Sequence, residues 1–294
     1  MSIIEKAAGK LDQIEIDGKA SARQNIIEMA AGRIEKGGIA RGIDQAHIHG
    51  TASQSNSIML DLTRFRQLGG VTHNEEKTQI AEEFRMIKRP LIKNAFNQGA
   101  GHIKNGNLIM VTSALAGEGK SFCAVNLAMS IAMEMDHTVL LVDADVARPS
   151  IPKYLGLPAQ RGLLDLLLDD KLELADVMIK TNIGKLSILT AGKKSMHATE
   201  LLASQSMSKL LSDIAQRYRD RIVIFDSPPL LLTTESHVLA TQMGQIVLVV
   251  EAETTPQKAV MEAIRQIESC DVINLIFNKA RYFPGAGHYG NYYA

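Results

Sequence analysis

An apolar run that leads straight into a glycine-bearing loop limits the folds open to this chain. Residues 108–111 read Leu-Ile-Met-Val, residues 114–121 read A-L-A-G-E-G-K-S, and a helical pattern continues from Phe122 to Ala128. A strand that ends in such a loop and opens a helix presents backbone N–H groups and the positive end of a helix dipole to an anion. The segment therefore predicts a phosphate-binding loop within an α/β fold.

The end of this loop indicates which anion is bound. In the pattern G-x-x-x-x-G-K-[ST] the lysine reaches the outer phosphates of a nucleoside triphosphate and the hydroxyl ligates Mg²⁺; Lys120 and Ser121 stand at these positions. Ala114 replaces the first glycine, which would exclude the motif only if that position required a positive φ. A nucleoside triphosphate with Mg²⁺ is thus the expected ligand, which the family resemblance described below specifies as ATP, and the alternative is a chance turn. The residues expected to form the cradle are Ala116, Gly117, Glu118, Gly119, Lys120, Ser121 and Phe122.

Composition argues against several other classes. The 32 Lys and Arg residues balance 32 Asp and Glu residues, so no overall charge favours nucleic acid. The cysteines, Cys123 and Cys270, lack metal-ligand spacing, which predicts buried thiols rather than a disulfide framework or a zinc site. No stretch approaches the about 18–20 apolar residues of a membrane span, and no secretory segment opens the chain. We expect a cytoplasmic protein whose membrane association runs through a partner.

The pattern changes along the chain and predicts three parts. Residues 1–75 are expected to be an arm with weak local structure, because glycines and a polar stretch break its short helical patterns. Residues 76–280 form the predicted nucleotide-binding domain, and residues 281–294 a flexible, tyrosine-rich tail. Three isolated histidines are weak metal candidates, because loop histidines are usually solvated: His47, His49 and His73.

Within the domain, apolar runs alternate with helical patterns. Most runs lack the period-two alternation of a half-exposed strand, which is typical of a parallel sheet covered on both faces. Repeated strand–helix units predict an α/β, doubly wound, mostly parallel sheet with helices on both faces, which binds ligands at the carboxyl ends of its strands. The expected strands are 108–112, 139–142, 186–189, 222–225, 246–250 and 272–277, and the expected helices are 121–134, 163–168, 199–218 and 256–269.

Two of the expected strands end in aspartates. Asp143 and Asp145 follow the strand 139–142, and Asp226 follows the strand 222–225. Since the carboxyl ends of parallel strands share one edge of the sheet, we expect these carboxylates near the phosphate loop, where Mg²⁺ is held by oxygen ligands and waters. A solvated turn is the alternative for each motif taken alone, but the ordered set of three motifs favours a nucleotide site.

The three motifs together resemble the bacterial tyrosine kinases, P-loop autokinases of polysaccharide export loci that are related to the MinD and ParA ATPases. The resemblance rests on A-G-E-G-K-S, L-L-V-D-A-D-V-A-R-P and V-I-F-D-S-P-P, and it covers residues 79–294. Residues 80–90, I-A-E-E-F-R-M-I-K-R-P, resemble the subgroup encoded with exosortase-associated exopolysaccharide clusters.

In the family this last segment is a helix with the pattern E-x-x-R-x-x-R, which packs subunits into a ring. Glu82, Arg85 and Lys88 match the pattern, with lysine in place of the last arginine. That replacement removes a bidentate donor and puts the ring contact in doubt. An ordinary surface helix with i,i+3 ion pairs is the alternative.

The resemblance also implies a role for each site residue. Lys120 would contact the β- and γ-phosphate oxygens, while Ser121, Asp145 and Asp226 would hold Mg²⁺. Asp143 would orient or deprotonate the incoming tyrosine hydroxyl, and an exchange of roles between Asp143 and Asp145 stays open. The further candidates are Arg148, near the transferred phosphate or at a subunit contact, and Asn278, at the adenine.

The chain ends in a cluster of tyrosines. Four of its six tyrosines lie within the last thirteen residues, among glycines and with no acidic residue after Ala280. A terminus of this kind can reach a neighbouring active site without unfolding anything, and packing contacts are the alternative on composition alone. The resemblance implies an autophosphorylation site, modified in trans, at Tyr282, Tyr289, Tyr292 and Tyr293.

Partners and rival functions follow from the same resemblance. The family's kinases regulate exopolysaccharide synthesis, chain length and export, which implies a ring-like homo-oligomer, a membrane-spanning chain-length regulator as activator, and a phosphotyrosine phosphatase. The main alternative is a MinD/ParA-type positioning ATPase. Against it, residues 114–116 lack the second lysine usual in those proteins, and the chain does not end in a basic amphipathic helix. A nucleotide-gated scaffold without phosphoryl transfer is the non-enzymatic alternative.

Overall fold

The computed structural model describes residues 57–72, 78–97, 99, 101–217 and 220–281. The chain divides into two units, Met1–Gln54 and Ser55–Ala294, and the first lies wholly outside the described residues. The four tail tyrosines and the three histidines of the predicted arm also lie outside them.

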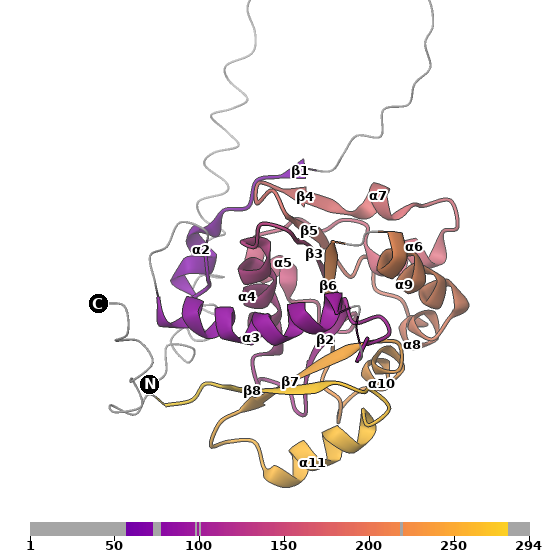
Figure 1. The fold of residues 1–294 in the computed structure, drawn as a ribbon. Coiled ribbons are helices and arrows are strands. Elements are labelled where there is room, and N and C mark those ends of the chain that lie inside the picture. Colours follow the sequence, from indigo (N-terminus) through magenta and orange to yellow (C-terminus); the bar gives the residue numbers. More distant parts are fainter. Residues whose placement is uncertain (1–56, 73–77, 98, 100, 218–219, 282–294) are drawn as a thin grey trace, which may run out of the picture. The chain divides into compact units, whose positions relative to one another are not determined.

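The core of the second unit is one sheet (Figure 1). Across the described residues, eight strands follow the order β1-β4-β5-β3-β6-β2-β7-β8, and the paired strands are parallel except for β4 and β5. This confirms the predicted fold class. The strands are β1 Ser57–Ile58, β2 Leu108–Ser113, β3 Thr138–Asp143, β4 Ile179–Thr181, β5 Leu186–Leu189, β6 Arg221–Asp226, β7 Gln245–Glu251 and β8 Ile273–Asn278.

Helices cover both faces of the sheet. Helices α2 to α5 contribute to one hydrophobic core and α6 to α11 to the other. Figure 1 shows α3 and α4 together over the first of these faces. The helices are α2 Leu62–Gln67, α3 Gln79–Phe96, α4 Lys120–Ala132, α5 Ile151–Leu155, α6 Leu163–Leu168, α7 Leu174–Val177, α8 Ala198–Leu202, α9 Gln205–Arg217, α10 Glu235–Ala240 and α11 Gln257–Gln266. No helix in these ranges is long and apolar enough to cross a bilayer.

The two cores explain the continuous apolar runs of the sequence. Successive residues of a strand point to opposite faces. In β2, Leu108 and Met110 therefore join the core under α8 to α11, while Ile109 and Val111 join the core under α3 and α4. Because both faces are covered, the first four residues of the strand are all apolar, and the two polar residues that end it, Thr112 and Ser113, bind backbone carbonyls with their hydroxyls.

The structure differs from the sequence prediction in several elements, among them the short helices α5, α7 and α10, which were not predicted. Residues 57–72, which the sequence places in the arm, carry β1 and α2, and Phe65 of α2 is fully buried in the core beneath α3. Strand β4 was not predicted. The expected helix 199–218 is two helices, because Ser204 caps the second one: its hydroxyl oxygen accepts the backbone N–H of Met207 at 3.2 Å.

Candidate nucleotide-binding site

The loop between β2 and α4 has the backbone that close approach to phosphates requires. Gly117 and Gly119 adopt φ values of +87° and +92°, which L side chains rarely tolerate. A Cβ atom on Gly119 would also lie 2.1 Å from the Asn278 side chain. Ala114, in contrast, is not among the described residues with positive φ, so its position does not need glycine. The departure from the usual motif is therefore compatible with a phosphate loop.

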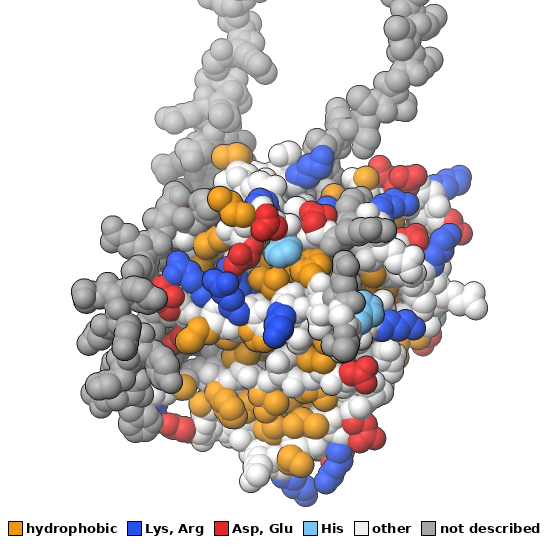
Figure 2. Space-filling model, viewed as in Figure 1, with side chains coloured by type: hydrophobic (Ala, Val, Ile, Leu, Met, Phe, Trp, Pro, Cys, Tyr) orange, Lys and Arg blue, Asp and Glu red, His pale blue; other side chains and the backbone are white. Residues whose placement is uncertain are grey.

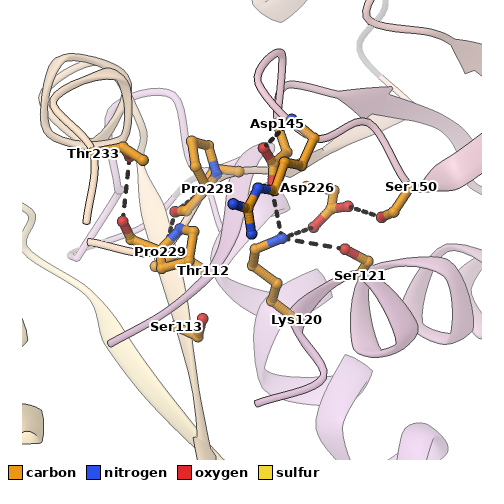
Figure 3. Close-up of polar contacts among 12 residues, drawn as sticks. Thr112, Ser113, Lys120, Ser121, Asp145, Ser150, Asp226, Pro228, Pro229 and Thr233 are labelled. Carbon is orange, nitrogen blue, oxygen red and sulfur yellow. Dashed lines mark hydrogen bonds and ion pairs between the residues drawn. The ribbon is translucent and has the colours of Figure 1, made fainter. Parts of the chain in front are cut away.

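Three strands bring the predicted polar groups together at one edge of the sheet. Strands β3, β6 and β2 are neighbours in that order, and Asp143 pairs in register with Asp226. Lys120 lies among the strand-end carboxylates (Figure 3): its Nζ is 2.7 Å from Asp145 Oδ2 and 4.0 Å from Asp226 Oδ1. The same Nζ donates to the Ser121 hydroxyl at 3.4 Å. The predicted lysine, serine and aspartates thus form one cluster.

Hydrogen bonds from the start of α5 hold Asp143 and Asp226 in place. Asp143 Oδ2 accepts the backbone N–H groups of Ser150 and Ile151, each at 3.1 Å, at the start of α5. The Ser150 hydroxyl donates to Asp226 Oδ2 at 3.4 Å. Ser150 is a site residue that the sequence analysis missed. A serine followed closely by Pro152 is a helix-start signal that could have marked it.

Burial and mutual repulsion govern the charges of this cluster. Burial, together with the neighbouring Asp226, raises the pKa of the Asp143 carboxyl to about 8. Burial raises the pKa of Asp226 to about 6, although Lys120 opposes this shift. For Lys120, burial alone would lower the pKa, but the carboxylates of Asp226 and Asp145 outweigh it and raise the pKa overall.

The residues present fit a magnesium ion bound together with a nucleotide. The buried atoms Asp143 Oδ1 and Asp226 Oδ1 have no hydrogen-bond partner in the described structure, and the Ser121 hydroxyl lies beside Lys120, whose Nζ is 4.0 Å from Asp226 Oδ1. Within the described ranges, no group of three His, Cys, Asp or Glu side chains is arranged to hold a metal. Mg²⁺ is typically held by one or two carboxylates, waters and substrate phosphates rather than by an all-protein cage. The donor set meets this requirement.

Of the two remaining candidates near the loop, the side chain of Asn278 contacts the loop and the side chain of Arg148 does not. Asn278 lies at the end of β8 and its Nδ2 donates to the Glu118 carbonyl at 2.8 Å, so it lies against the phosphate loop. The backbone N–H of Arg148 donates to Asp145 Oδ1 at 3.0 Å, while its side chain is exposed. Cys123 and Cys270 are both buried, as predicted.

The three residues predicted to contact a neighbouring subunit do not share one surface. On α3, Ala81, Phe84, Lys88 and Leu91 form the buried face. The Lys88 Nζ lies 2.6 Å from both the Ser130 carbonyl and the Glu134 carboxylate, at the end of α4. Glu82 and Arg85 pair with each other on the half-exposed face. The ion pair between Glu82 and Arg85 has the i,i+3 spacing of the alternative prediction, an ordinary surface helix. Lys88, in contrast, is bound within its own chain because α3 packs against α4.

The fold and this cluster define a P-loop nucleotide-binding protein. The ParA family model, described as NUBPL iron-transfer P-loop NTPase, matches residues 104–277. Tyrosine-protein kinase YwqD of Bacillus subtilis is 30% identical over 200 residues, which are 68% of this chain and 80% of YwqD. The chain belongs to the ParA family of P-loop NTPases and, within it, to the bacterial tyrosine-protein kinases.

Two further relatives cover most of the described fold. CapB of Staphylococcus aureus is 28% identical over 222 residues, 75% of this chain and 93% of CapB. The crystal structure of the chimerical protein CapA2B2 superposes with a TM-score of 0.59 and 26% identity, over 75% of this chain and 92% of that chain. The family resemblance seen in the three motifs is thereby confirmed, whereas the exosortase-associated subgroup stays a prediction.

Proposed function

We propose that this protein is an ATP-dependent tyrosine autokinase that transfers the γ-phosphoryl group to the terminal tyrosines of a neighbouring copy. One observation carries the proposal. Lys120, Ser121 and the strand-end aspartates meet at the phosphate loop, and two buried carboxylate oxygens there have no hydrogen-bond partner in the described structure. Phosphoryl transfer asks a protein chiefly to position groups and to neutralise charge, and these are the groups it needs.

The proposed roles follow from position. Lys120 binds the β- and γ-phosphate oxygens, since its Nζ already lies where negative charges converge. Ser121, Asp145 and Asp226 hold Mg²⁺, which would neutralise the developing charge on the phosphoryl group. Asn278, beside the Glu118 carbonyl, contacts the adenine. Arg148 projects from the same edge and faces either the transferred phosphate or another subunit.

Asp143 is the proposed base for the tyrosine hydroxyl. A general base works best when its pKa is close to the working pH, and the pKa of Asp143 is raised to about 8 by burial and by Asp226. Its Oδ1 has no hydrogen-bond partner in the described structure. The alternative is that Asp145, which is paired with Lys120, takes this role and Asp143 supports the metal.

The position at which the tail begins supports its role as substrate. Strand β8 ends at Asn278, which touches the phosphate loop, and the tyrosines start at Tyr282. The tail therefore leaves the domain at the edge that carries the site. A segment without acidic residues is not repelled by the strand-end aspartates. Each phosphate group would add about −1.5 to −2 charge, so a phosphorylated tail would be repelled by them. Modified tails would then leave the site and loosen the assembly.

The cellular setting is proposed from the family. The protein would work at the cytoplasmic side of the inner membrane beside a membrane-spanning chain-length regulator, and control exopolysaccharide synthesis, chain length and export. A phosphotyrosine phosphatase would reverse the modification. The ring-like homo-oligomer would use the exposed face of α3, which carries Glu82 and Arg85. Figure 2 shows Lys and Arg side chains gathered over α3.

The proposal is tested by mass spectrometry of the terminal peptide after incubation of the full chain with Mg·ATP. We expect phosphate on the tail tyrosines of the wild type and none on a Lys120→Met variant of unchanged fold. Two other functions remain candidates because the chain matches the ParA family. A switch-type ATPase would hydrolyse ATP and leave the tail unlabelled, and a nucleotide-gated scaffold would bind ATP and transfer nothing. An unlabelled wild-type tail, or a labelled tail in the Lys120→Met variant, would refute the autokinase mechanism.

A further inference from the structure

A carboxylate stands inside the phosphate loop. Glu118 lies between Gly117 and Gly119, both of which adopt positive φ, and only 2% of its surface is exposed. A negative charge this close to a triphosphate weakens binding unless it is turned away and held. The two flanking glycines also leave the loop backbone free to adopt other shapes. The loop therefore needs an anchor that holds both the backbone and this side chain.

The Glu118 carboxylate is bound on both oxygens. Its Oε2 accepts the backbone N–H of Leu115 at 2.6 Å, which closes the loop on itself. Its Oε1 accepts the hydroxyl of Thr255, and the backbone N–H of Glu251 at 3.5 Å. Thr255 lies in the turn between β7 and α11, far from the loop in sequence. The carboxylate is therefore directed at protein groups.

The backbone of Glu118 is held from the same side. Its carbonyl accepts Asn278 Nδ2 at 2.8 Å, and the carbonyl of Asn278 accepts the N–H of Ala252 at 2.9 Å. The next residue, Lys279, pairs with Glu251 at 2.8 Å. The ends of β7 and β8 thus form one hydrogen-bonded unit that holds Glu118 by its side chain and by its carbonyl.

We infer that Thr255 is a positioning residue for nucleotide binding, which acts through Glu118. Its hydroxyl keeps the Glu118 carboxylate turned away from the phosphates and keeps the loop in the shape that accepts them. The inference rests on the proposed function of the loop. It adds a link between the phosphate end of the site and the turn that follows β7, on the side where Asn278 lies.

Two substitutions of Thr255 separate this role from simple packing. Thr255→Val keeps the shape and removes the hydroxyl, while Thr255→Ser keeps the hydroxyl and removes a methyl group. If the hydroxyl holds Glu118, Thr255→Val weakens nucleotide binding and Thr255→Ser leaves it close to that of the wild type. If only the shape of the side chain matters, Thr255→Ser weakens binding more than Thr255→Val. The matched control is Thr181→Val. Thr181 also loses hydroxyl bonds, to Ile183 and Leu186, but lies on β4, which β5, β3 and β6 separate from β2.

The measurement is the Kd of Mg·ATP for the full chain, combined with hydrogen exchange of the amides of residues 114–121 without nucleotide. We expect Thr255→Val to raise the Kd about tenfold and to speed exchange in the loop, because the hydrogen bond to the Glu118 carboxylate is lost together with the one that the hydroxyl oxygen accepts from the backbone N–H of Glu251. Thr255→Ser and Thr181→Val should stay within about twofold of the wild type. Adding Thr255→Val to a Glu118→Ala variant should have little further effect, since Glu118→Ala has already removed the carboxylate that the hydroxyl binds.

Failure of this inference is distinct from failure of the proposed function. Equal Kd values and equal loop exchange for Thr255→Val and the wild type would overturn the inference while nucleotide binding stands. The expected losses, combined with a tail that is never phosphorylated, would support the anchor and remove the kinase step. A wild-type chain that does not bind Mg·ATP would overturn both.

Discussion

Asp143 and Asp226 are two buried carboxyl groups at this site whose charged forms are destabilised in the folded protein. They face each other in register on β3 and β6, and each has an oxygen without a hydrogen-bond partner in the described structure. Burial raises the pKa of both carboxyls, to about 8 for Asp143 and about 6 for Asp226. Without a cation, the folded protein therefore holds a proton that the unfolded chain releases near the ordinary pKa of 3.8.

This difference sets the direction of the pH dependence. A group whose pKa is higher in the folded state stabilises the fold at low pH, and this stabilisation is lost as pH rises toward the folded pKa. Without Mg²⁺ and nucleotide, the free energy of unfolding should fall between about pH 4 and pH 8. An Asp143→Asn variant should flatten this fall. Urea unfolding in EDTA at several pH values measures it, and identical slopes for variant and wild type would contradict the account.

Lys88 shows how one element holds another in place. It lies on the buried face of α3, and its Nζ binds the Ser130 carbonyl and the Glu134 carboxylate at the end of α4, the helix that begins with the phosphate loop. A cation at a helix C-terminus binds carbonyls that have no partner within the helix. The hydrogen bond from Lys88 also lowers the pKa of Glu134. This lysine therefore ties α3 to α4.

We expect Lys88→Met to lower the free energy of unfolding by about 1–3 kcal/mol, because the buried Ser130 carbonyl loses a charged donor. Lys93→Met is the matched control, since Lys93 is exposed on the same helix. Chemical unfolding and light scattering are measured together. A change in oligomer mass with unaltered stability would show instead that Lys88 contacts a neighbouring subunit, as the family pattern suggests.

The elements that could be predicted are those whose own residues determine them. Strands β2, β3, β5, β6, β7 and β8 are apolar runs between polar turns, and parallel pairing then brings Lys120 and the aspartates to one edge. Strands β1 and β4 are two and three residues long, too short to form a pattern. The burial of Lys88 and the bond between Glu118 and Thr255 depend on partners 42 and 137 residues away, which no local pattern reveals.

At the scale of the whole molecule, the proposed mechanism assigns the site and its substrate tyrosines to different copies. The last described residues leave the sheet beside the phosphate loop, and the edge strand β8 exposes Leu275 and Phe277. Exposed apolar side chains on an edge strand, together with the charged outer face of α3, are surfaces that a second copy can cover. Transfer between copies would couple phosphorylation to assembly, since charge added to the tails would drive them away from the strand-end aspartates.

Transfer between copies is tested most directly by mixing two variants, neither of which can phosphorylate its own tail. One chain carries Lys120→Met and an intact tail; the other has an intact phosphate loop and phenylalanine in place of Tyr282, Tyr289, Tyr292 and Tyr293. After incubation with Mg·ATP, mass spectrometry should find phosphate on the tail of the Lys120→Met chain in the mixture and none on either chain alone. A Lys120→Met tail that stays unlabelled in the mixture, under conditions in which the wild-type chain labels its own tail, would contradict transfer to a neighbour.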